Sequence, residues 1–176
     1  MTDEHTGQGT TPVNERHVEW RERVRGDSIG FRWKQLGATA GSDALGCSLY
    51  EVYPGKRSWP YHYHLANEEA LYVLAGDGRL RTFERSLPLE PGDYVAFPVG
   101  EASAHQVVNP GPTPLRYLCF SEMNHPDVVE YPDSEKLAVF GGDGPRPGAA
   151  DEGFERVFEA AAAVEYWRGE PPVDPE

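Results

Sequence analysis

The chain is 176 residues long, which is the usual length of a single domain. It has 29 acidic and 16 basic residues, a net charge of −13, and such a surface repels phosphate backbones, so nucleic acid is not expected as a partner. No apolar run approaches the roughly 18 residues of a membrane span, and the polar N-terminus has no apolar signal-peptide core. We therefore expect a soluble cytoplasmic protein that does not contact a membrane. Residues 1–14 are small and polar and are predicted to form a disordered tail.

Short apolar or alternating segments recur along the chain, separated by turns rich in Gly and Pro. The predicted strands span residues 31–35, 45–50, 70–75, 80–83, 87–89, 94–97, 105–108, 115–120, 127–131 and 137–140. Strands of this length and spacing are typical of an all-β sandwich or barrel. The residues Gly76-Asp77-Gly78 form a strong turn signal, so we expect the strands before and after them to pair as a hairpin.

The C-terminal part of the chain has a different character. We expect one barrel over residues 15–142, followed by a loop and a short extension over residues 143–176. Within this extension the segment from Phe154 to Trp167 contains four consecutive alanines, which favour helix, and one short helix is predicted there.

Three histidines and a glutamate form the pattern that carries chemistry. His62 and His64 are two residues apart, and residues two apart on a strand project from the same face, so two imidazoles are directed at one point. Glu69 follows five residues later, and His105 comes from a separate predicted strand. Three neutral imidazoles and one carboxylate suit a divalent transition metal, namely Fe, Mn, Ni, Co or Zn.

These residues lie within two ordered blocks of Gly, Pro, His and Asn. The blocks are residues 54–64 with Glu69 and Gly76, and residues 92–93 and 98–100 with His105 and Asn109. In both blocks the pattern resembles the cupin superfamily, in particular its small single-domain members. Two loops are longer than the usual motif, by one residue before His62 and by two residues before His105, and added loop length has a small free-energy cost.

The resemblance implies a double-stranded β-helix, or jelly-roll barrel, that holds one metal and pairs as a homodimer. It carries the metal-ligand role to His62, His64, Glu69 and His105. Glu68 is the alternative carboxylate, but six residues separate Glu69 from Gly76, as the motif requires, so Glu69 is preferred.

A divalent ion with one carboxylate ligand leaves the site at about +1, which would attract a small anionic or enolisable molecule. Dioxygenase-type oxidation of such a substrate is the leading hypothesis. A sugar or sugar-phosphate isomerase or epimerase, and a barrel that only binds a small ligand, remain alternatives. Phe97 and Phe120 are expected to line the site, while Tyr61 and Tyr63 alternate with the histidines and are expected to point away from the metal. No residue outside the four ligands is identified as a general base.

Overall fold

The structure is a computed structural model that describes residues 11–142 and 153–171. The predicted tail over residues 1–14 lies mostly outside the described residues, as does the stretch 143–152 of the predicted loop. Among the described residues the regular structure is mostly β, which confirms the predicted class. The helical elements are α1 (Leu36–Thr39) and four 3-10 turns, η1 (Glu15–His17), η2 (Glu101–Ser103), η3 (Pro132–Ser134) and η4 (Ala160–Ala162).

Thirteen strands are present in the described part of the chain. In chain order they are β1 (Arg21–Arg25), β2 (Ile29–Gln35), β3 (Leu45–Val52), β4 (Tyr63–His64), β5 (Glu69–Ala75), β6 (Gly78–Arg81), β7 (Ser86–Leu89), β8 (Tyr94–Phe97), β9 (Gln106–Val108), β10 (Leu115–Glu122), β11 (Asp127–Tyr131), β12 (Lys136–Gly141) and β13 (Phe154–Glu159). Every strand predicted from the sequence is found, with ends shifted by a few residues at most. β1 and β13 were not predicted, and β4 was expected only as the strand that carries His62 and His64.

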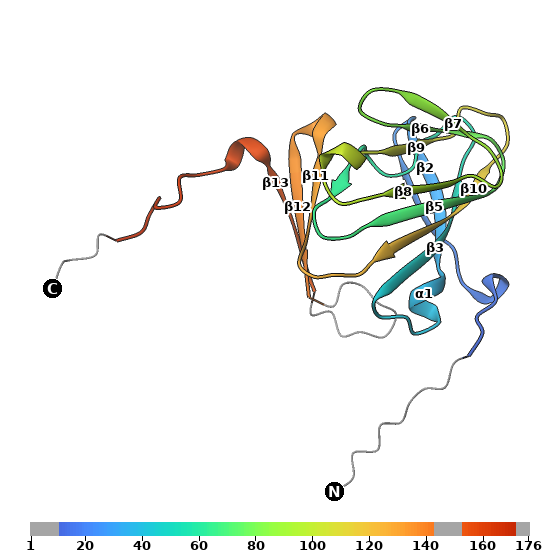
Figure 1. The fold of residues 1–176 in the computed structure, drawn as a ribbon, viewed down its shortest axis with the longest axis horizontal. Helices are drawn as coiled ribbons and strands as arrows, with labels where there is room; N and C mark the ends of the chain where they lie inside the picture. The colour runs from blue at the N-terminus through green and yellow to red at the C-terminus, as the bar shows by residue number, and fades with distance from the viewer. Residues whose placement is uncertain (1–10, 143–152, 172–176) are drawn as a thin grey trace, which may run out of the picture.

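The strands form three sheets that together make a jelly-roll arrangement (Figure 1). The largest has the order β1-β2-β3-β10-β5-β8, and the others have the orders β13-β12-β11-β4 and β7-β6-β9. The two smaller sheets are linked where His62 and His105 form an antiparallel bridge. β11, β12 and β13 stand together at one end of the molecule, and the chain after β13 leads away from it (Figure 1).

The core lies between the sheets, and strand alternation determines which side chains enter it. On β5, Leu71 and Val73 are 1% exposed, whereas Tyr72 and Leu74 on the opposite face are 40% and 42% exposed. The other large buried side chains of this core are Phe31, Val52, Leu80, Leu89, Phe97, Val107, Leu115 and Tyr117. Burial of these groups is the main favourable contribution to folding, and it also packs the walls of the site described below.

The hairpin predicted at Gly76-Asp77-Gly78 is wrong. β5 pairs with β10 and β8, whereas β6 pairs with β7 and β9, so the turn carries the chain from one sheet to another. Gly76 has φ +79, and a Cβ there would overlap the carbonyl oxygen of Pro114. A Cβ on Gly78 would lie 2.5 Å from the Leu115 side chain. The two glycines allow the chain to pass close to Pro114 and Leu115 as it leaves one sheet for the other. Their turn propensity alone does not distinguish such a turn from a hairpin.

The helix predicted over residues 154–167 is also wrong. Phe154 to Glu159 form β13, which pairs antiparallel with β12 along its whole length, and only Ala160 to Ala162 form a single 3-10 turn. A run of four alanines is too short to offset the cost of starting a helix. The open edge of β12 supplies backbone hydrogen bonds to the aromatic and β-branched residues that precede the alanines.

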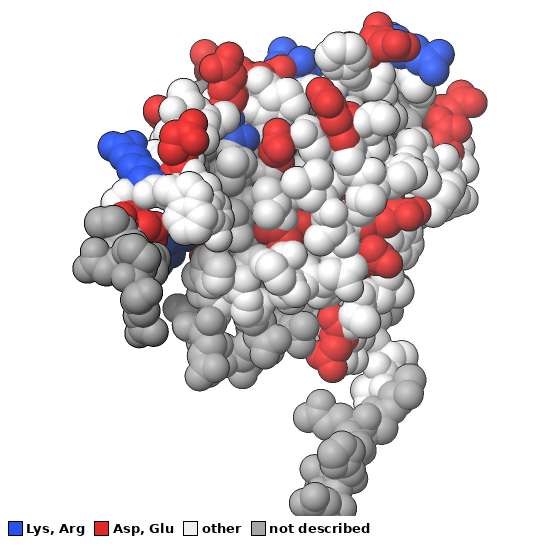
Figure 2. Space-filling model, turned by 60° about the vertical axis from the view of Figure 1, so that its left-hand side comes forward, with Lys and Arg blue, Asp and Glu red and all other residues white. Residues whose placement is uncertain are grey.

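Acidic side chains are distributed over the face that carries β11 to β13, while Lys and Arg lie mostly near its upper and left edges (Figure 2). This distribution agrees with the net charge of −13. No helix among the described residues is both long enough and apolar enough to cross a membrane.

Candidate metal centre

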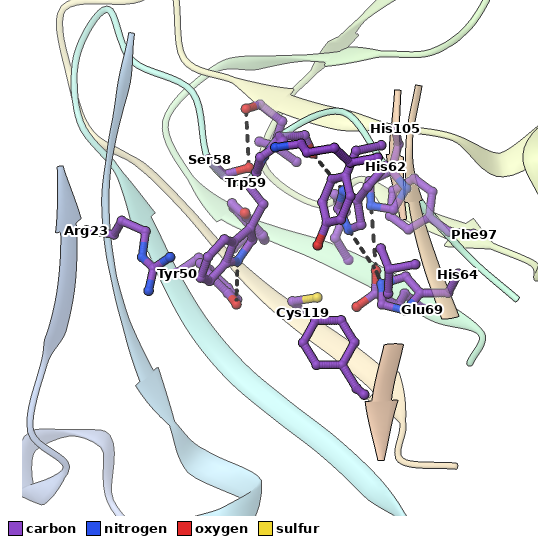
Figure 3. Close-up of a pocket in the computed structure, with 18 of the residues that line it drawn as sticks. Arg23, Tyr50, Ser58, Trp59, His62, His64, Glu69, Phe97, His105 and Cys119 are labelled. Carbon is purple, nitrogen blue, oxygen red and sulfur yellow. Dashed lines mark hydrogen bonds and ion pairs between the residues drawn. The ribbon is translucent and has the colours of Figure 1, made fainter. Parts of the chain in front are cut away.

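Backbone pairing brings the four predicted ligands together from three parts of the chain. The His62 amide donates to the His105 carbonyl at 3.1 Å, and the His105 amide donates to the His62 carbonyl at 2.9 Å. His64 belongs to β4, which pairs with β11, and Glu69 is the first residue of β5 in the six-stranded sheet. The four side chains thereby converge between the sheets (Figure 3).

Glu69 lies at the centre of this group. Its Oε2 is 3.8 Å from Nε2 of His62, 3.4 Å from Nε2 of His64 and 3.7 Å from Nε2 of His105. Ligand atoms of His62, Glu69 and His105 all lie within 4.8 Å of one another, so these three residues form a group that can hold a metal ion. His64 is outside that trio and approaches the group through Glu69.

Each imidazole is oriented by a hydrogen bond from its other nitrogen. Nδ1 lies 2.8 Å from the Pro60 carbonyl in His62, 2.6 Å from the Asp127 carboxylate in His64 and 3.0 Å from the Ser103 carbonyl in His105. These oxygens accept, so Nδ1 carries the proton and the lone pair of a neutral ring is on Nε2, the atom that faces Glu69. Metal-binding histidines in proteins are oriented in this way, and the donor set therefore fits a transition metal.

Burial and the neighbouring charges shift the pKa values in this group in different directions. Burial favours the neutral form and lowers the pKa of His105 to about 3 and that of His62 below its usual value. Burial also disfavours a charged His64, but the Asp127 and Glu69 carboxylates outweigh this and raise its pKa to about 10. Burial would raise the pKa of Glu69, yet His64 and the other imidazoles lower it to about 2. Without metal, these shifts favour a positively charged His64 beside an ionised Glu69, with His62 and His105 neutral.

The two candidate carboxylates have different surroundings. The Glu69 side chain is 13% exposed and lies among the histidines, whereas Glu68 is exposed and its amide donates to Glu122 Oε2 at 3.1 Å. The structure therefore places Glu69, and not Glu68, beside the three imidazoles.

A cavity of about 470 Å³ opens from this cluster. Most of its wall is aromatic or apolar, and it includes Tyr50, Trp59, Leu71, Phe97, Val107, Tyr117, Cys119, Val129, Tyr131, Phe140 and Val157. Phe97 stacks on His105, with ring centroids 3.6 Å apart, as expected for a lining residue. Phe120, the other expected lining residue, is not part of the wall. Tyr61 and Tyr63 pack with Ala104 in a separate buried cluster and do not line the cavity.

Hydrogen bonds and stacking order the aromatic wall. Trp59 Nε1 donates to the Tyr50 hydroxyl at 3.0 Å, and Tyr50 stacks on Tyr117 with centroids 5.2 Å apart and planes 9° from parallel. Burial raises the pKa of Tyr50, Tyr117 and Cys119, so these three groups stay protonated at neutral pH.

The sequence interpretation missed several residues of the site. Asp127 orients His64, and its only sequence signal is an acidic residue at the start of a predicted strand. Arg23, Lys136 and Glu155 line the cavity from β1, β12 and β13, two of which were not predicted as strands. The alternation Arg21-Glu22-Arg23-Val24-Arg25 was the available signal for β1.

Comparison with known proteins agrees with this geometry. The model of the cupin domain matches residues 48–121, which include all four predicted ligands. The L-ectoine synthases of Bordetella parapertussis and Bordetella bronchiseptica are each 30% identical to this chain over 101 residues, which cover 56% of this chain and 71% of theirs.

Solved structures match over a longer stretch. A putative sugar phosphate isomerase from Acidithiobacillus ferrooxidans is 28% identical with a TM-score of 0.73, covering 88% of this chain and 95% of that one. A sugar phosphate isomerase from Silicibacter pomeroyi, 22% identical with a TM-score of 0.74 and covering 87% and 95% of the two chains, shows the same fold. Together with the His and Glu pattern of the two blocks, these matches establish that the chain belongs to the cupin superfamily.

Proposed function

We propose that the protein is a metal-dependent enzyme that carries out dioxygenase-type oxidation of a small anionic or enolisable substrate. His62, His64, Glu69 and His105 would hold one divalent transition metal, namely Fe, Mn, Ni, Co or Zn. When bound, such an ion polarises the oxygen atoms of a chelating substrate, and Fe, Mn or Ni also supplies redox chemistry with dioxygen.

The chemistry of the cavity wall carries the proposal. Isomerisation moves protons on the substrate and needs a group that accepts them near neutral pH. Around the cluster the described wall offers hydrocarbon, aromatic rings and the protonated side chains of Tyr50, Tyr117 and Cys119. Apart from these three groups and the four proposed ligands, the ionisable residues of the wall are Arg23, Lys136, Glu155 and Tyr131, which lie on β1 and on β11 to β13. Oxidation of a substrate that already binds as an anion needs no such base, so this wall suits oxidation better than isomerisation.

The residues of the chain have distinct roles in this proposal. Asp127, Pro60 and Ser103 orient the three imidazoles through their acceptor oxygens. Phe97 and Tyr131 stack against His105 and His62, with centroids 3.6 and 6.2 Å apart, and restrict the access of water to the cluster. The exclusion of water strengthens every electrostatic interaction within the cavity.

Oxygen uptake tests the proposal directly. Metal-free protein is loaded in separate samples with Fe(II), Mn(II), Ni(II), Co(II) or Zn(II) and supplied with catecholates, 1,2-diketones and hydroxy acids. We expect substrate-dependent oxygen consumption with a redox-active ion and none with Zn(II). Glu69→Gln and His64→Ala should lose metal and activity, whereas Glu68→Gln, the same change one residue away, should retain both. Turnover that is equally fast without oxygen would refute the oxidation.

Non-oxidative conversion of a sugar or sugar phosphate is the second candidate. It is supported by the 28% identity to a structure described as a putative sugar phosphate isomerase and by the match to the L-ectoine synthases. In the described wall, Arg23 and Lys136 are the only cations available to a phosphate group. Anaerobic turnover of a sugar phosphate, with no oxygen requirement, would favour this candidate over oxidation.

We also propose that the protein acts as a cytoplasmic homodimer on its small-molecule substrate. Support for a dimer comes from large side chains exposed after the β12 strand: Phe154, Phe158, Tyr166 and Trp167 are 46–84% exposed. Light scattering over a range of concentrations should give twice the mass of the 19.6 kDa chain, and a single-chain mass at all concentrations would exclude the dimer.

A further inference from the structure

We propose that Arg23 binds a carboxylate group of the substrate at the end of the cavity that lies away from the histidines. This inference rests on the proposed function for its premise that a small substrate enters the cavity, and it adds the class of that substrate. The substrate would have a chelating end at the cluster, a flat apolar middle and a carboxylate at Arg23.

The position of Arg23 follows from the pairing of β1 with β2. Arg21, Arg23 and Arg25 lie opposite Trp33, Phe31 and Ile29, so the three arginines share the face of β1 that is continuous with the inner face of β2. Of the three, only Arg23 lines the cavity. In Figure 3 its guanidinium is directed towards Tyr50 and Trp59, and the histidines lie beyond these two rings.

No described carboxylate balances the charge of Arg23. Its guanidinium carbon lies 4.9 Å from the centre of the Trp59 ring, and none of the ion pairs in the described chain includes it. The neighbouring Glu22 is on the opposite face of β1, where it accepts a hydrogen bond from the Tyr53 hydroxyl. In a protein of net charge −13, an unpaired guanidinium at a cavity wall is free to bind an anionic ligand.

Lys136, the other cation of the wall, has a different environment. It lies on β12 directly opposite Glu159 of β13, and Glu155 of the same strand also lines the cavity. The Lys136 ammonium lies 5.9 Å from the centre of the Tyr131 ring, and Tyr131 in turn stacks on His62 with ring centroids 6.2 Å apart. Lys136 is therefore on the histidine side of the cavity, and an anionic group at the other end depends on Arg23.

The chemistry of the guanidinium and its surroundings indicates a carboxylate. A planar guanidinium forms two parallel hydrogen bonds with a carboxylate, and the contact of its carbon with the Trp59 ring at 4.9 Å holds it at the cavity wall. A phosphate dianion is usually bound by more than one cation, and Arg23 is the only cation at this end of the described wall. Between Arg23 and the histidines, Trp59, Tyr50 and Tyr117 present flat rings that suit a flat hydrocarbon segment.

Binding of three matched probes tests the inference. The full-length protein, both metal-free and loaded with Zn(II), is titrated by calorimetry with 3-phenylpropanoate, with its neutral amide and with 3-phenylpropyl phosphate. We expect wild type to bind the carboxylate about tenfold or more tightly than the amide, the size of effect that a charged hydrogen-bond pair produces. Arg23→Gln should abolish this preference, and Arg23→Lys should restore part of it.

Arg21→Gln and Arg25→Gln are the matched controls, because they remove the same charge from the same face two residues away. Both should keep the preference for the carboxylate. Equal loss in all three variants would overturn the inference, because it would indicate a diffuse positive field. Tighter binding of the phosphate than of the carboxylate, or no carboxylate binding by wild type, would overturn it as well.

The two proposals fail in distinguishable ways. The probes do not react, so their binding does not depend on oxygen uptake. A preference that depends on Arg23 in a protein that never consumes oxygen would refute the oxidation and leave the carboxylate site in place. Oxygen uptake without that preference would refute the carboxylate site alone.

Discussion

The two ends of the cavity are built in opposite ways. At the histidine end the side chains of His62, His64, Glu69 and His105 are 9–17% exposed, and each imidazole has a fixed acceptor on Nδ1. At the other end, Arg23 lies on an edge strand whose five residues are all exposed, and its charge has no described partner. The first end is arranged to hold an ion in a fixed geometry, whereas the second is accessible and can select a ligand.

Removing the central carboxylate should have the largest effect on the histidine end. Glu69→Gln keeps the shape but removes the negative charge that faces three Nε2 atoms at 3.4–3.8 Å. We expect metal affinity to fall by more than the roughly 100-fold that outer hydrogen-bond partners contribute. Competition with a chelator measures this, and unchanged affinity would show that Glu69 is not a ligand. Binding of phenylpropanoate at the Arg23 end should change little.

Acidification should destabilise the metal-free protein because of His105 at the histidine end of the cavity. Burial lowers the folded-state pKa of His105 to about 3, while the unfolded value is about 6.5, so protons bind preferentially to the unfolded chain between these two pH values. The free energy of unfolding should therefore fall between pH 6.5 and 5, by roughly 1 to 2 kcal/mol. Urea unfolding in the presence of a chelator measures it. His105→Gln should flatten the slope, and a wild type whose stability does not change over this range would contradict the argument.

Removing the carboxylate charge that orients His64 should have a smaller effect on metal affinity. Asp127 accepts from His64 Nδ1 at 2.6 Å and from the Ala66 amide at 3.1 Å. Asp127→Asn can keep the second bond but loses the charge that fixes the imidazole, so metal affinity should fall about 10–100-fold. Asp133→Asn, which removes a surface carboxylate paired with Arg81, is the matched control and should leave metal affinity unchanged. Equal metal affinities in the two variants would show that Asp127 does not support metal binding.

A substitution on β1 should have the smallest effect. Val24 is 60% exposed on the face of β1 opposite Arg23, so Val24→Thr removes little buried surface. We expect the free energy of unfolding to stay within about 0.5 kcal/mol of wild type and the metal affinity to be unchanged. Thermal and urea unfolding measure this. A large loss of stability would show that the strand is packed more tightly than its exposure indicates.

The histidine end could be predicted from the sequence because its information is local. His62 and His64 need only the two-residue period of a strand, and the turns around His105 show that it comes from a different strand. The sequence also favoured Glu69 over Glu68, and the structure places Glu69 in the cluster. Asp127 was missed because its link to His64 depends on the pairing of β4 with β11, which no local pattern reports.

The Arg23 end could not be predicted in the same way. β1 has alternating charged residues and only one apolar residue, so its hydrophobic pattern is weak, and β13 contains residues that also suit a helix. Both strands form because an adjacent strand edge supplies hydrogen bonds. The error at Gly76-Asp77-Gly78 has a similar origin, because a turn between sheets and a hairpin turn need the same residues and differ only in which strands pair afterwards.

The reciprocal backbone bonds between His62 and His105 lead to an expectation about the order of events during folding. The two residues are separated by residues 63–104, so their pairing closes a long loop, and such contacts form slowly. A chain that has folded only its first block presents His62, His64 and Glu69 without the fourth donor. The metal ion is therefore expected to bind after the sheets have paired. Folding of the sheets would then not require the ion.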